Sequence, residues 1–256
     1  MSIFQIENKD KIAPLFDGWQ ETLIWSCLQN CMGLAFADSL ENPQAAQILN
    51  ADFCFFAGKP NAELVKNKPS KLEQDFIIMI PENENWAEMI ESVYGKKAVR
   101  TERYAIKKEA DVFNLKFLKG LAESLKKPYE IRMIDSGIYE QIKTIGWAGD
   151  LISQFADYED YRQRGIGAVV LKDGIPVSGA SSYTVYRNGI EIEIDTREDE
   201  RRKGLASAAG ARLILECISR ELYPSWDAQN TGSVALAEKL GYHFDYAYPA
   251  YEVMGY

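Results

Sequence analysis

The clearest chemical signal in the sequence is a charged, glycine-punctuated turn at residues 201–206, Arg-Arg-Lys-Gly-Leu-Ala. It stands between a strand-like run, 189–196, and a strongly apolar, helix-like run, 205–222. Backbone N–H groups at a helix N-terminus have no partners inside the helix, and the helix dipole favours negative charge there. Gly204 permits a close backbone approach, and the small Ala206 leaves room beside it. The turn therefore predicts an anion site that fits a pyrophosphate best, with an exposed basic turn as the alternative.

The cysteines and the single histidine give no signal for metal chemistry. Cys27 and Cys31 recur with Ile24 and Leu28 at helical spacing, which predicts that both thiols pack in a core. The chain has one histidine and no Cys-x-x-Cys pair, so no metal site is predicted. His243 stands at the start of a strand-like run, where we expect a surface or pairing role rather than catalysis.

The composition indicates an ordinary soluble protein that is long for one domain and comfortable for two. Of its 256 residues, 46% are hydrophobic and 26% are charged, and the formal net charge is −9. An acidic chain disfavours nucleic acid as a partner and mildly favours a cationic small molecule, although a solubilising surface explains the same charge. The sequence shows no N-terminal signal pattern and no apolar run near the ~20 residues that cross a bilayer, so a cytoplasmic protein without a membrane partner is expected.

Around the turn, the second half of the sequence indicates a mixed α/β domain. Turn signals at Asp173-Gly174 and Asn188-Gly189 predict that successive strands form hairpins. Polar and aromatic sequence up to Arg164 is predicted as a loop. Strands are predicted at 129–134, 165–171, 175–186, 190–196, 223–227, 242–248 and 251–253, and helices at 139–145, 205–222 and 231–240.

The first half repeats this order without the basic turn. Strands are predicted at 33–37, 44–49, 52–57, 74–80 and 99–106, and helices at 20–32, 61–65 and 85–94. In place of the basic turn stands Gly58-Lys59-Pro60-Asn61, where Lys59 is the only charge and Pro60 removes a backbone donor. This predicts a duplicated fold with a degenerate first copy, and a coincidental likeness of two α/β segments is the alternative.

The basic turn matches the phosphate-binding signature Gln/Arg-x-x-Gly-x-Gly/Ala of the GNAT acyltransferase superfamily, which the chain resembles. The likeness extends to the strand 191–196, to Asn230, and to 238–242, which is similar to the family's Lys-Leu-Gly-Phe ending. Longer strings at 193–196, 204–206, 223–227 and 236–242 resemble a narrower bacterial subfamily whose namesakes include zwittermicin A resistance acetyltransferases. The resemblance implies a mixed α/β (α+β) fold with a mostly antiparallel sheet flanked by helices. It also implies a degenerate GNAT-like N-terminal lobe, 1–127, and a catalytic lobe that binds acyl-CoA, 128–256.

The resemblance further implies acetyl-CoA as co-substrate and no metal. Backbone N–H groups from the turn would hold the pyrophosphate of coenzyme A, with the Arg201 side chain in support. The backbone of Ile194 and Thr196 would pair with the pantetheine amides like an added strand. Asn230 would meet the pantetheine arm, and a helix N-cap is its alternative role. The turn residues that would contribute their N–H groups are Arg202, Lys203, Gly204, Leu205, Ala206 and Ser207.

In this family the acyl group passes directly from thioester to amine, so a base must first deprotonate the ammonium. Glu191 and Glu193 alternate with isoleucines, so both carboxylates are expected on one face of the strand. Closeness to the expected thioester places Glu193 ahead of Glu191, and two exposed carboxylates on an amphipathic strand are the alternative. A backbone N–H near Glu193 could stabilise the oxyanion.

The family's usual general acid, a tyrosine, is replaced by Ala237 when the chains are aligned through Lys239-Leu240-Gly241. Either another tyrosine substitutes for it, the candidates being Tyr223, Tyr242 and Tyr248, or the thiolate leaves unprotonated. The acceptor is expected between the two glutamates and residues 156–164. There Asp157, Glu159 and Asp160 could hold an ammonium beside Tyr158 and Tyr161, although a solvated acidic loop is the favoured interpretation of that run.

The sequence thus predicts an N-acetyltransferase that moves an acetyl group from acetyl-CoA to the amine of a small molecule. A non-catalytic sensor that binds acyl-CoA and a protein N-acyltransferase remain the alternatives. The replaced tyrosine favours the sensor, and the two glutamates favour the enzyme. The oligomeric state stays open, with a dimer as one option.

Overall fold

The computed structural model of the chain describes residues 2–70 and 74–256. The described chain forms two compact units. One comprises residues up to Arg103 together with Ala247–Tyr256, and the other comprises Tyr104–Tyr246. The chain passes from the first to the second along β6 (Ala98–Ile106) and returns along β13 (Phe244–Met254).

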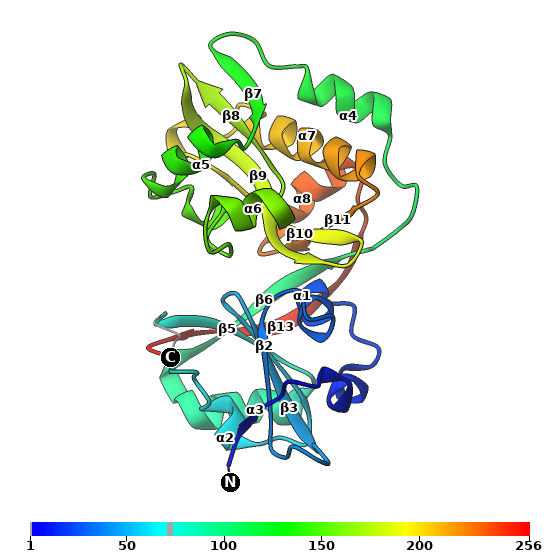
Figure 1. Cartoon of the computed structure of the whole chain (residues 1–256), viewed down its shortest axis with the longest axis vertical. Coiled ribbons are helices and arrows are strands. Elements are labelled where there is room, and N and C mark those ends of the chain that lie inside the picture. The colour runs from blue at the N-terminus through cyan, green and yellow to red at the C-terminus, as the bar shows by residue number, and fades with distance from the viewer. Residues whose placement is uncertain (1, 71–73) are drawn as a thin grey trace. The chain divides into compact units, whose positions relative to one another are not determined.

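The second unit is built on a sheet with the order β11-β10-β9-β8-β7 (Figure 1). Neighbouring strands are antiparallel except for β10 and β11, which are parallel. The two predicted hairpin turns carry left-handed residues, with φ 51° at Asp173, 81° at Gly174 and 69° at Asn188. Bulky side chains avoid this region, so the turn residues fix the strand ends. The strands are β7 (Tyr129–Met133), β8 (Gly167–Lys172), β9 (Ile175–Tyr186), β10 (Gly189–Thr196) and β11 (Tyr223–Ser225).

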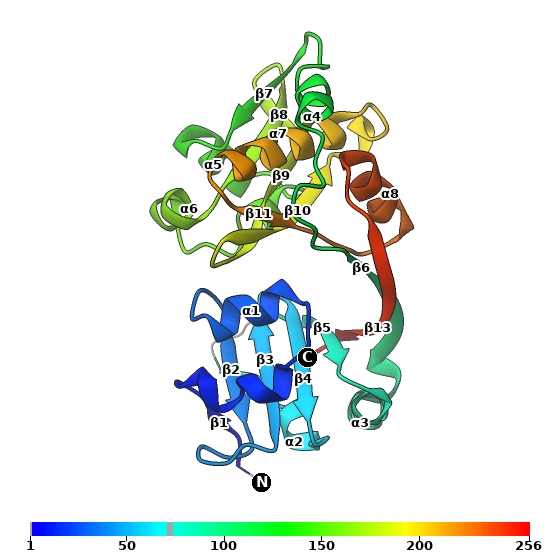
Figure 2. The ribbon, with the colours of Figure 1, turned by 90° about the vertical axis from the view of Figure 1, so that its right-hand side faces the viewer.

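Helices cover both faces of this sheet (Figure 2). On one face lies α7 (Leu205–Ser219), where Gly210 has no Cβ and packs against the Ile194 side chain of β10. On the other lies α6 (Tyr158–Arg164), whose Tyr161 hydroxyl bonds Ser181 Oγ of β9 at 2.8 Å. The remaining elements are α4 (Leu115–Ala122), which packs along α7, α5 (Ser136–Lys143), α8 (Thr231–Leu240), β12 (Asp227–Ala228) and the 3-10 turns η4 (Gly149–Leu151) and η5 (Glu198–Glu200).

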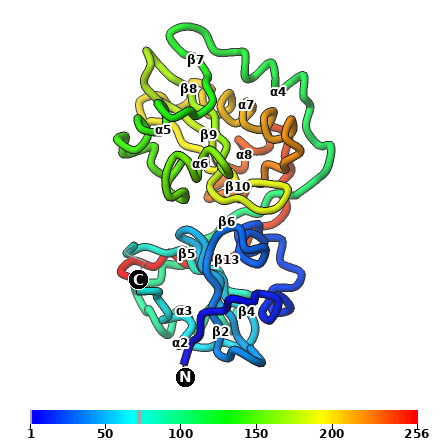
Figure 3. Tube along the Cα trace, viewed as in Figure 1, coloured from blue at the N-terminus to red at the C-terminus, as the bar shows by residue number. Residues whose placement is uncertain are grey.

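The sheet of the first unit has the order β1-β2-β3-β4-β5-β13 and continues with β6 and β12. Figure 3 traces the chain through this unit. The pair β4 and β5 is parallel, as β10 and β11 are in the second unit. Its core packs Phe56, Ile77, Met79 and Trp86 with Tyr251 of β13. The elements are β1 (Phe4–Gln5), β2 (Leu34–Ala37), β3 (Ala45–Asn50), β4 (Phe53–Gly58), β5 (Phe76–Pro81), α1 (Thr22–Leu28), α2 (Ala62–Val65), α3 (Glu84–Tyr94) and the 3-10 turns η1 (Lys9–Lys11), η2 (Ala13–Phe16) and η3 (Gly95–Lys97).

The mixed, mostly antiparallel architecture and the repeated order of elements agree with the sequence prediction. The predicted boundary between residues 127 and 128 differs from the division of the chain after Arg103. The predicted strands 242–248 and 251–253 form the single strand β13, and Tyr251 to Met254 of that strand pair antiparallel with β5. Hydrogen bonds between strands far apart in sequence therefore assign the C-terminal residues to the first unit, which local patterns do not reveal.

Two helices of the second unit differ from the sequence prediction. α4 was not predicted, and the segment predicted as an acidic loop contains α6. Asp157 caps α6 by accepting the Asp160 N–H at 2.9 Å. Ion pairs one turn apart, Glu159 with Arg162 and Asp160 with Arg164, then stabilise the helix. The spacing of opposite charges was the signal for this helix.

Candidate active site

The basic turn links η5 to α7 and leaves a row of backbone donors without acceptors. Arg202 and Gly204 both have left-handed backbones, with φ 61° and 81°, and Gly204 is the N-cap of α7. Within the described part of the chain, no acceptor is found for the N–H groups of residues 202–207. Alternating backbone conformations and a helix N-terminus both gather N–H groups around an anion. The turn has the donors that a phosphate needs.

The three cations of the turn differ in what they contact. Arg201 Nε donates to the Thr196 carbonyl at 3.1 Å. Lys203 Nζ bonds Glu200 Oε2 at 2.8 Å and the Asp199 carbonyl at 3.0 Å. Among the described residues, the exposed Arg202 side chain has no hydrogen bond or ion pair. Arg202 is therefore the cation of the turn that a ligand can engage without displacing a protein partner.

A buried carboxylate that the sequence analysis missed anchors the turn from beneath. Glu200 is only 1% exposed, and its oxygens bond Lys172 Nζ at 2.6 Å, the Tyr129 hydroxyl at 2.6 Å and Lys203 Nζ. The hydrogen bonds from Lys172, Lys203 and Tyr129, in that order of weight, hold the pKa of Glu200 at about 2. Since opposite charges and donors favour the ionised form, the carboxylate ties the end of η5 to β7 and β8.

The corresponding turn of the first unit has its donors occupied. The Gly58 N–H bonds Glu82 Oε2 at 3.0 Å, and the Lys59 N–H bonds the Gln44 carbonyl at 2.8 Å. Asn61 caps α2 by accepting from the N–H groups of Glu63 and Leu64. In the first unit, side chains and backbone carbonyls thus accept from N–H groups whose counterparts in the second unit remain available to an anion.

The parallel pairing of β10 with β11 covers only the first residues of β10. Its register runs from Gly189 opposite Tyr223 to Glu191 opposite Ser225, and no further pairing follows. The Arg197 N–H bonds the Val177 carbonyl, so by alternation the backbone groups of Ile194 and Thr196 face away from β9. The predicted pantetheine edge therefore lies on the open side of β10.

The two backbone groups of Thr196 already have partners on that side. Its N–H donates to Asp195 Oδ1 at 2.6 Å, and its carbonyl accepts from Arg201 Nε. A ligand that pairs with Thr196 must displace these side chains. Within the described chain, no side chain competes in the same way for the backbone of Ile194.

Glu191 and Glu193 share one face of β10, as predicted. Glu193 is half-buried and lies opposite Ser181, on the face that α6 covers. Glu191 is buried, with 5% of its surface exposed, and lies between Thr184 of β9 and Ser225 of β11. The interpretation of both glutamates as exposed surface residues is therefore wrong for Glu191.

Phenols surround the buried glutamate. Burial chiefly raises the pKa values of Tyr186, Tyr223 and Tyr242, and the nearby charge of Glu191 raises all three further. The Tyr242 hydroxyl donates to the Pro224 carbonyl at 2.6 Å, and the Tyr223 hydroxyl donates to the Lys107 carbonyl at 3.3 Å. Two of the three candidate general acids, Tyr223 and Tyr242, thus donate their hydroxyl proton to a backbone carbonyl, and the third, Tyr248, is half-buried in the first unit. The position of the family tyrosine, Ala237, is fully buried.

The alternative role of Asn230, a helix N-cap, is confirmed. Its side-chain oxygen accepts the Ser233 N–H at 3.0 Å, which leaves the amide nitrogen as the group that could meet a ligand. Ser233 Oγ accepts from Trp226 Nε1 at 3.0 Å, so its hydroxyl supports the protein. The acidic side chains at Asp157, Glu159 and Asp160 are occupied by the cap and ion pairs of α6, so none is an open ammonium site.

The remaining sequence signals are structural. Cys27 is buried and Cys31 partly buried, and within residues 2–70 and 74–256 neither forms a disulfide. His243 Nδ1 lies 2.6 Å from Glu109 Oε2, which fits the expected pairing role. Among residues 2–70 and 74–256, no group of three or more His, Cys, Asp or Glu side chains is placed to hold a metal ion. In the same residues no helix is long and apolar enough to cross a bilayer.

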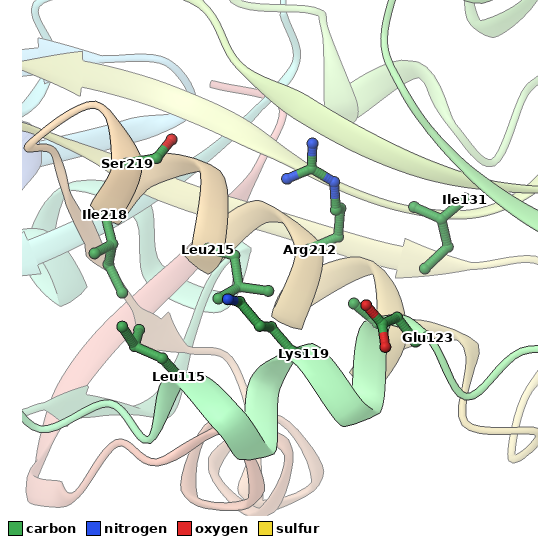
Figure 4. A pocket seen from close by; sticks show the side chains of 9 residues that line it. Leu115, Lys119, Glu123, Ile131, Arg212, Leu215, Ile218 and Ser219 are labelled. Atoms are coloured by element: carbon green, nitrogen blue, oxygen red, sulfur yellow. The ribbon is translucent and has the colours of Figure 1, made fainter.

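A groove of about 630 Å³ lies outside the site, between α4 and α7 (Figure 4). Leu115 and Lys119 of α4 extend toward Leu215 and Ile218 of α7. None of the predicted site residues lines it.

Comparison with known proteins agrees with this geometry. The sequence model of the family described as "GNAT acetyltransferase" matches residues 13–251. The uncharacterized N-acetyltransferase YdfB of Bacillus subtilis (strain 168) is 27% identical over 269 residues, which cover 94% of this chain and 95% of that protein. A GCN5-related N-acetyltransferase-like protein from Streptococcus suis is 44% identical with a TM-score of 0.90, over 96% of this chain and 98% of that structure. A tandem GNAT protein from the clavulanic acid biosynthesis pathway, 9% identical, shares the fold with a TM-score of 0.54 over 100% of this chain and 99% of its own.

Proposed function

The chain belongs to the GNAT acetyltransferase family of acyltransferases, and from that premise we propose that it transfers an acetyl group from acetyl-CoA to the amine of a small molecule. The second unit carries the active site, and the first is its degenerate counterpart. A cytoplasmic location, where acetyl-CoA is available, and a small cationic acceptor complete the proposal. The acidic net charge of −9 attracts such an acceptor at long range.

The observation that carries the proposal is the row of backbone donors at residues 202–207 beside the open edge of β10. The N–H groups of the turn would hold the pyrophosphate, and the Arg202 guanidinium would add a charge-assisted contact. The backbone of Ile194, and of Thr196 once Asp195 and Arg201 withdraw, would hold the pantetheine arm as an added strand. The Asn230 amide nitrogen is placed on the next element, at the N-terminus of α8. Acetyl-CoA supplies an activated acyl group to this site.

The two glutamates take different parts because their surroundings differ. A half-buried carboxylate keeps its charge and binds an ammonium, whereas a buried carboxylate accepts a proton more readily because burial disfavours the charged form. We therefore assign the ammonium contact to Glu193 and proton removal to Glu191. This assignment reverses the order given by closeness to the expected thioester, in which Glu193 came first. Glu191 is the more buried carboxylate, and it lies where the pairing of β10 with β11 ends.

The experiment is a measurement of thiol release from acetyl-CoA with a panel of amines, amino-bearing antibiotics included. Wild type should turn over at least one amine. Glu191→Gln should lower kcat by about 10²–10⁴-fold, the range that a general base supplies. Glu193→Gln should chiefly raise KM for the amine, and Glu130→Gln, an exposed glutamate on β7, should change neither constant.

The buried Ala237, which offers no phenol where the family has one, favours a second candidate, a sensor that binds acyl-CoA without turnover. Tight acetyl-CoA binding with no thiol release across the whole panel would support the sensor and contradict the enzyme.

A further inference from the structure

The hydroxyl of Thr184 is set apart from the other buried hydroxyls of its sheet. Thr184 has no solvent exposure, and its Oγ1 has no hydrogen-bond partner among the described residues. By contrast, Ser181 bonds Tyr161, Ser225 bonds Tyr186 and Ser178 bonds Thr196, with oxygens 2.7 to 2.8 Å apart. A buried hydroxyl without a hydrogen-bond partner destabilises the folded state and is therefore rare. This indicates that Thr184 bonds a group other than the protein.

The backbone aims Thr184 at Glu191. Glu191 pairs in register with Thr184, and residues paired in this way have neighbouring side chains on one face of a sheet. The next pair is Ile192 with Ser182, so Tyr183 is an extra residue on β9. Such a bulge re-aims the neighbouring side chains and is common beside active sites. Without the extra residue, Tyr183 rather than Thr184 would lie opposite Glu191.

We infer that Thr184 is a positioning residue that binds one water molecule beside the Glu191 carboxylate, and that this water passes the acceptor's proton to Glu191. The inference rests on the proposed function. In the step, the ammonium gives a proton to the water as the water gives another to the carboxylate. The products are a neutral amine, the same water and a carboxylic acid. A buried water needs at least two polar partners, and Thr184 and Glu191 provide them.

Among the groups near Glu191, the Thr184 hydroxyl is the one that a substitution can remove without breaking a hydrogen bond within the described protein. The titratable groups around it are Glu193 on the same strand, Tyr186 on β9, Tyr223 on β11, Tyr242 after α8, and Cys217 on α7, which affects the pKa values of Tyr186 and Tyr242. The three phenols have raised pKa values and remain neutral while Glu191 titrates. Ser225, on the other side of Glu191, is already bonded to Tyr186.

The test is Thr184→Val, which replaces a hydroxyl by a methyl group of similar size. We expect Tm to change little, because the hydroxyl has no partner among the described residues to lose. We expect kcat to fall about tenfold or more, up to the ~10²–10⁴-fold that general-base catalysis supplies. Thr184→Ser should restore most of kcat. Thr22→Val, the same change at an equally buried threonine of the first unit, should leave kcat and its pH profile unchanged.

Two further measurements separate the possible outcomes. In a Glu191→Gln background, Thr184→Val should cost no additional kcat, because both act on one step. In a carboxyl-carbon NMR titration, with the Glu191 signal identified by its loss in Glu191→Gln, Thr184→Val should move the Glu191 midpoint upward. That titration needs no acceptor, so it tests the pairing even if no amine is turned over. An unchanged midpoint, or an unchanged kcat in an active enzyme, would overturn the inference while leaving the acetyltransferase proposal intact.

Discussion

The ammonium of Lys203 lies 2.8 Å from the carboxylate of Glu200, which is buried beneath the turn before α7. This pairing turns one of the three cations of the turn inward. Arg201 is likewise held on the Thr196 carbonyl, so the basic character of the sequence overstates the positive charge that the turn presents to a ligand. Most of the predicted phosphate contact then comes from backbone N–H groups and Arg202.

The exposed Arg202 should matter most among the three cations for coenzyme A binding. Arg202→Gln removes a charge-assisted contact of about 1.5–3 kcal/mol, which corresponds to at least a tenfold rise in Kd. Lys203→Gln should raise Kd by less than about threefold, because that ammonium bonds Glu200 rather than the ligand. Isothermal titration calorimetry with coenzyme A gives both values, and a larger loss from Lys203→Gln would contradict the assignment.

Glu200 should make the fold sensitive to acid. Its pKa of about 2 in the folded chain is below the ~4.3 of an unfolded glutamate, so the folded chain takes up this proton at lower pH. The stabilisation is therefore complete above about pH 4.5 and is lost as the pH falls toward 2. Glu200→Gln should lower Tm at pH 7 and flatten the fall of Tm over that acid range. Equal acid profiles for wild type and variant in thermal melts would show that the carboxylate does not anchor the turn.

Gly204→Glu should abolish coenzyme A binding, because it places a carboxylate where the pyrophosphate charge is expected. It also strains the backbone, since φ is 81° at Gly204. Gly174 in the β8–β9 turn has the same φ of 81°, and a Cβ at either glycine meets nothing within 4 Å. Gly174→Glu is therefore the matched control, with a similar strain of about 1–2 kcal/mol and no expected loss of affinity. Equal affinities of the two variants would show that strain, not charge at the turn, governs binding.

Asn230→Ser separates the two roles of that residue. Serine is also a preferred N-cap, so Tm should change little. The substitution removes the amide nitrogen, and we expect the affinity for acetyl-CoA to fall by roughly three- to tenfold, the loss of one neutral hydrogen bond. If neither the affinity for acetyl-CoA nor Tm changes, Asn230 acts only as a helix cap.

Local signals were sufficient for the elements that carry the site. The bounds of β10 follow from Asn188-Gly189 and the alternation of isoleucine and glutamate, and those of α8 follow from Asn230 and Gly241. The capping groups and turn residues that fix these ends are adjacent in sequence to the elements they bound, so a local pattern is enough to predict them.

What could not be predicted depends on contacts distant in sequence. Glu200 stands in an acidic run, 198–200, that is typical of a surface turn, and its burial depends on Tyr129 and Lys172 far upstream. Thr184 faces Glu191 only because of the extra residue Tyr183, and a strand pattern does not show a bulge. The pairing of β13 with β5 is likewise a tertiary outcome, which is why the C-terminal residues belong to the first unit although the sequence placed them in the second lobe.

Backbone amide NMR of the chain titrated with acetyl-CoA tests the central claim most directly. The N–H groups of residues 202–207 have no protein acceptor within the described chain, and we predict that their proton resonances move downfield together as they bond the pyrophosphate. The Gly58 and Lys59 amides, which are already bonded, should stay in place. Saturable binding that leaves residues 202–207 unmoved would contradict the account.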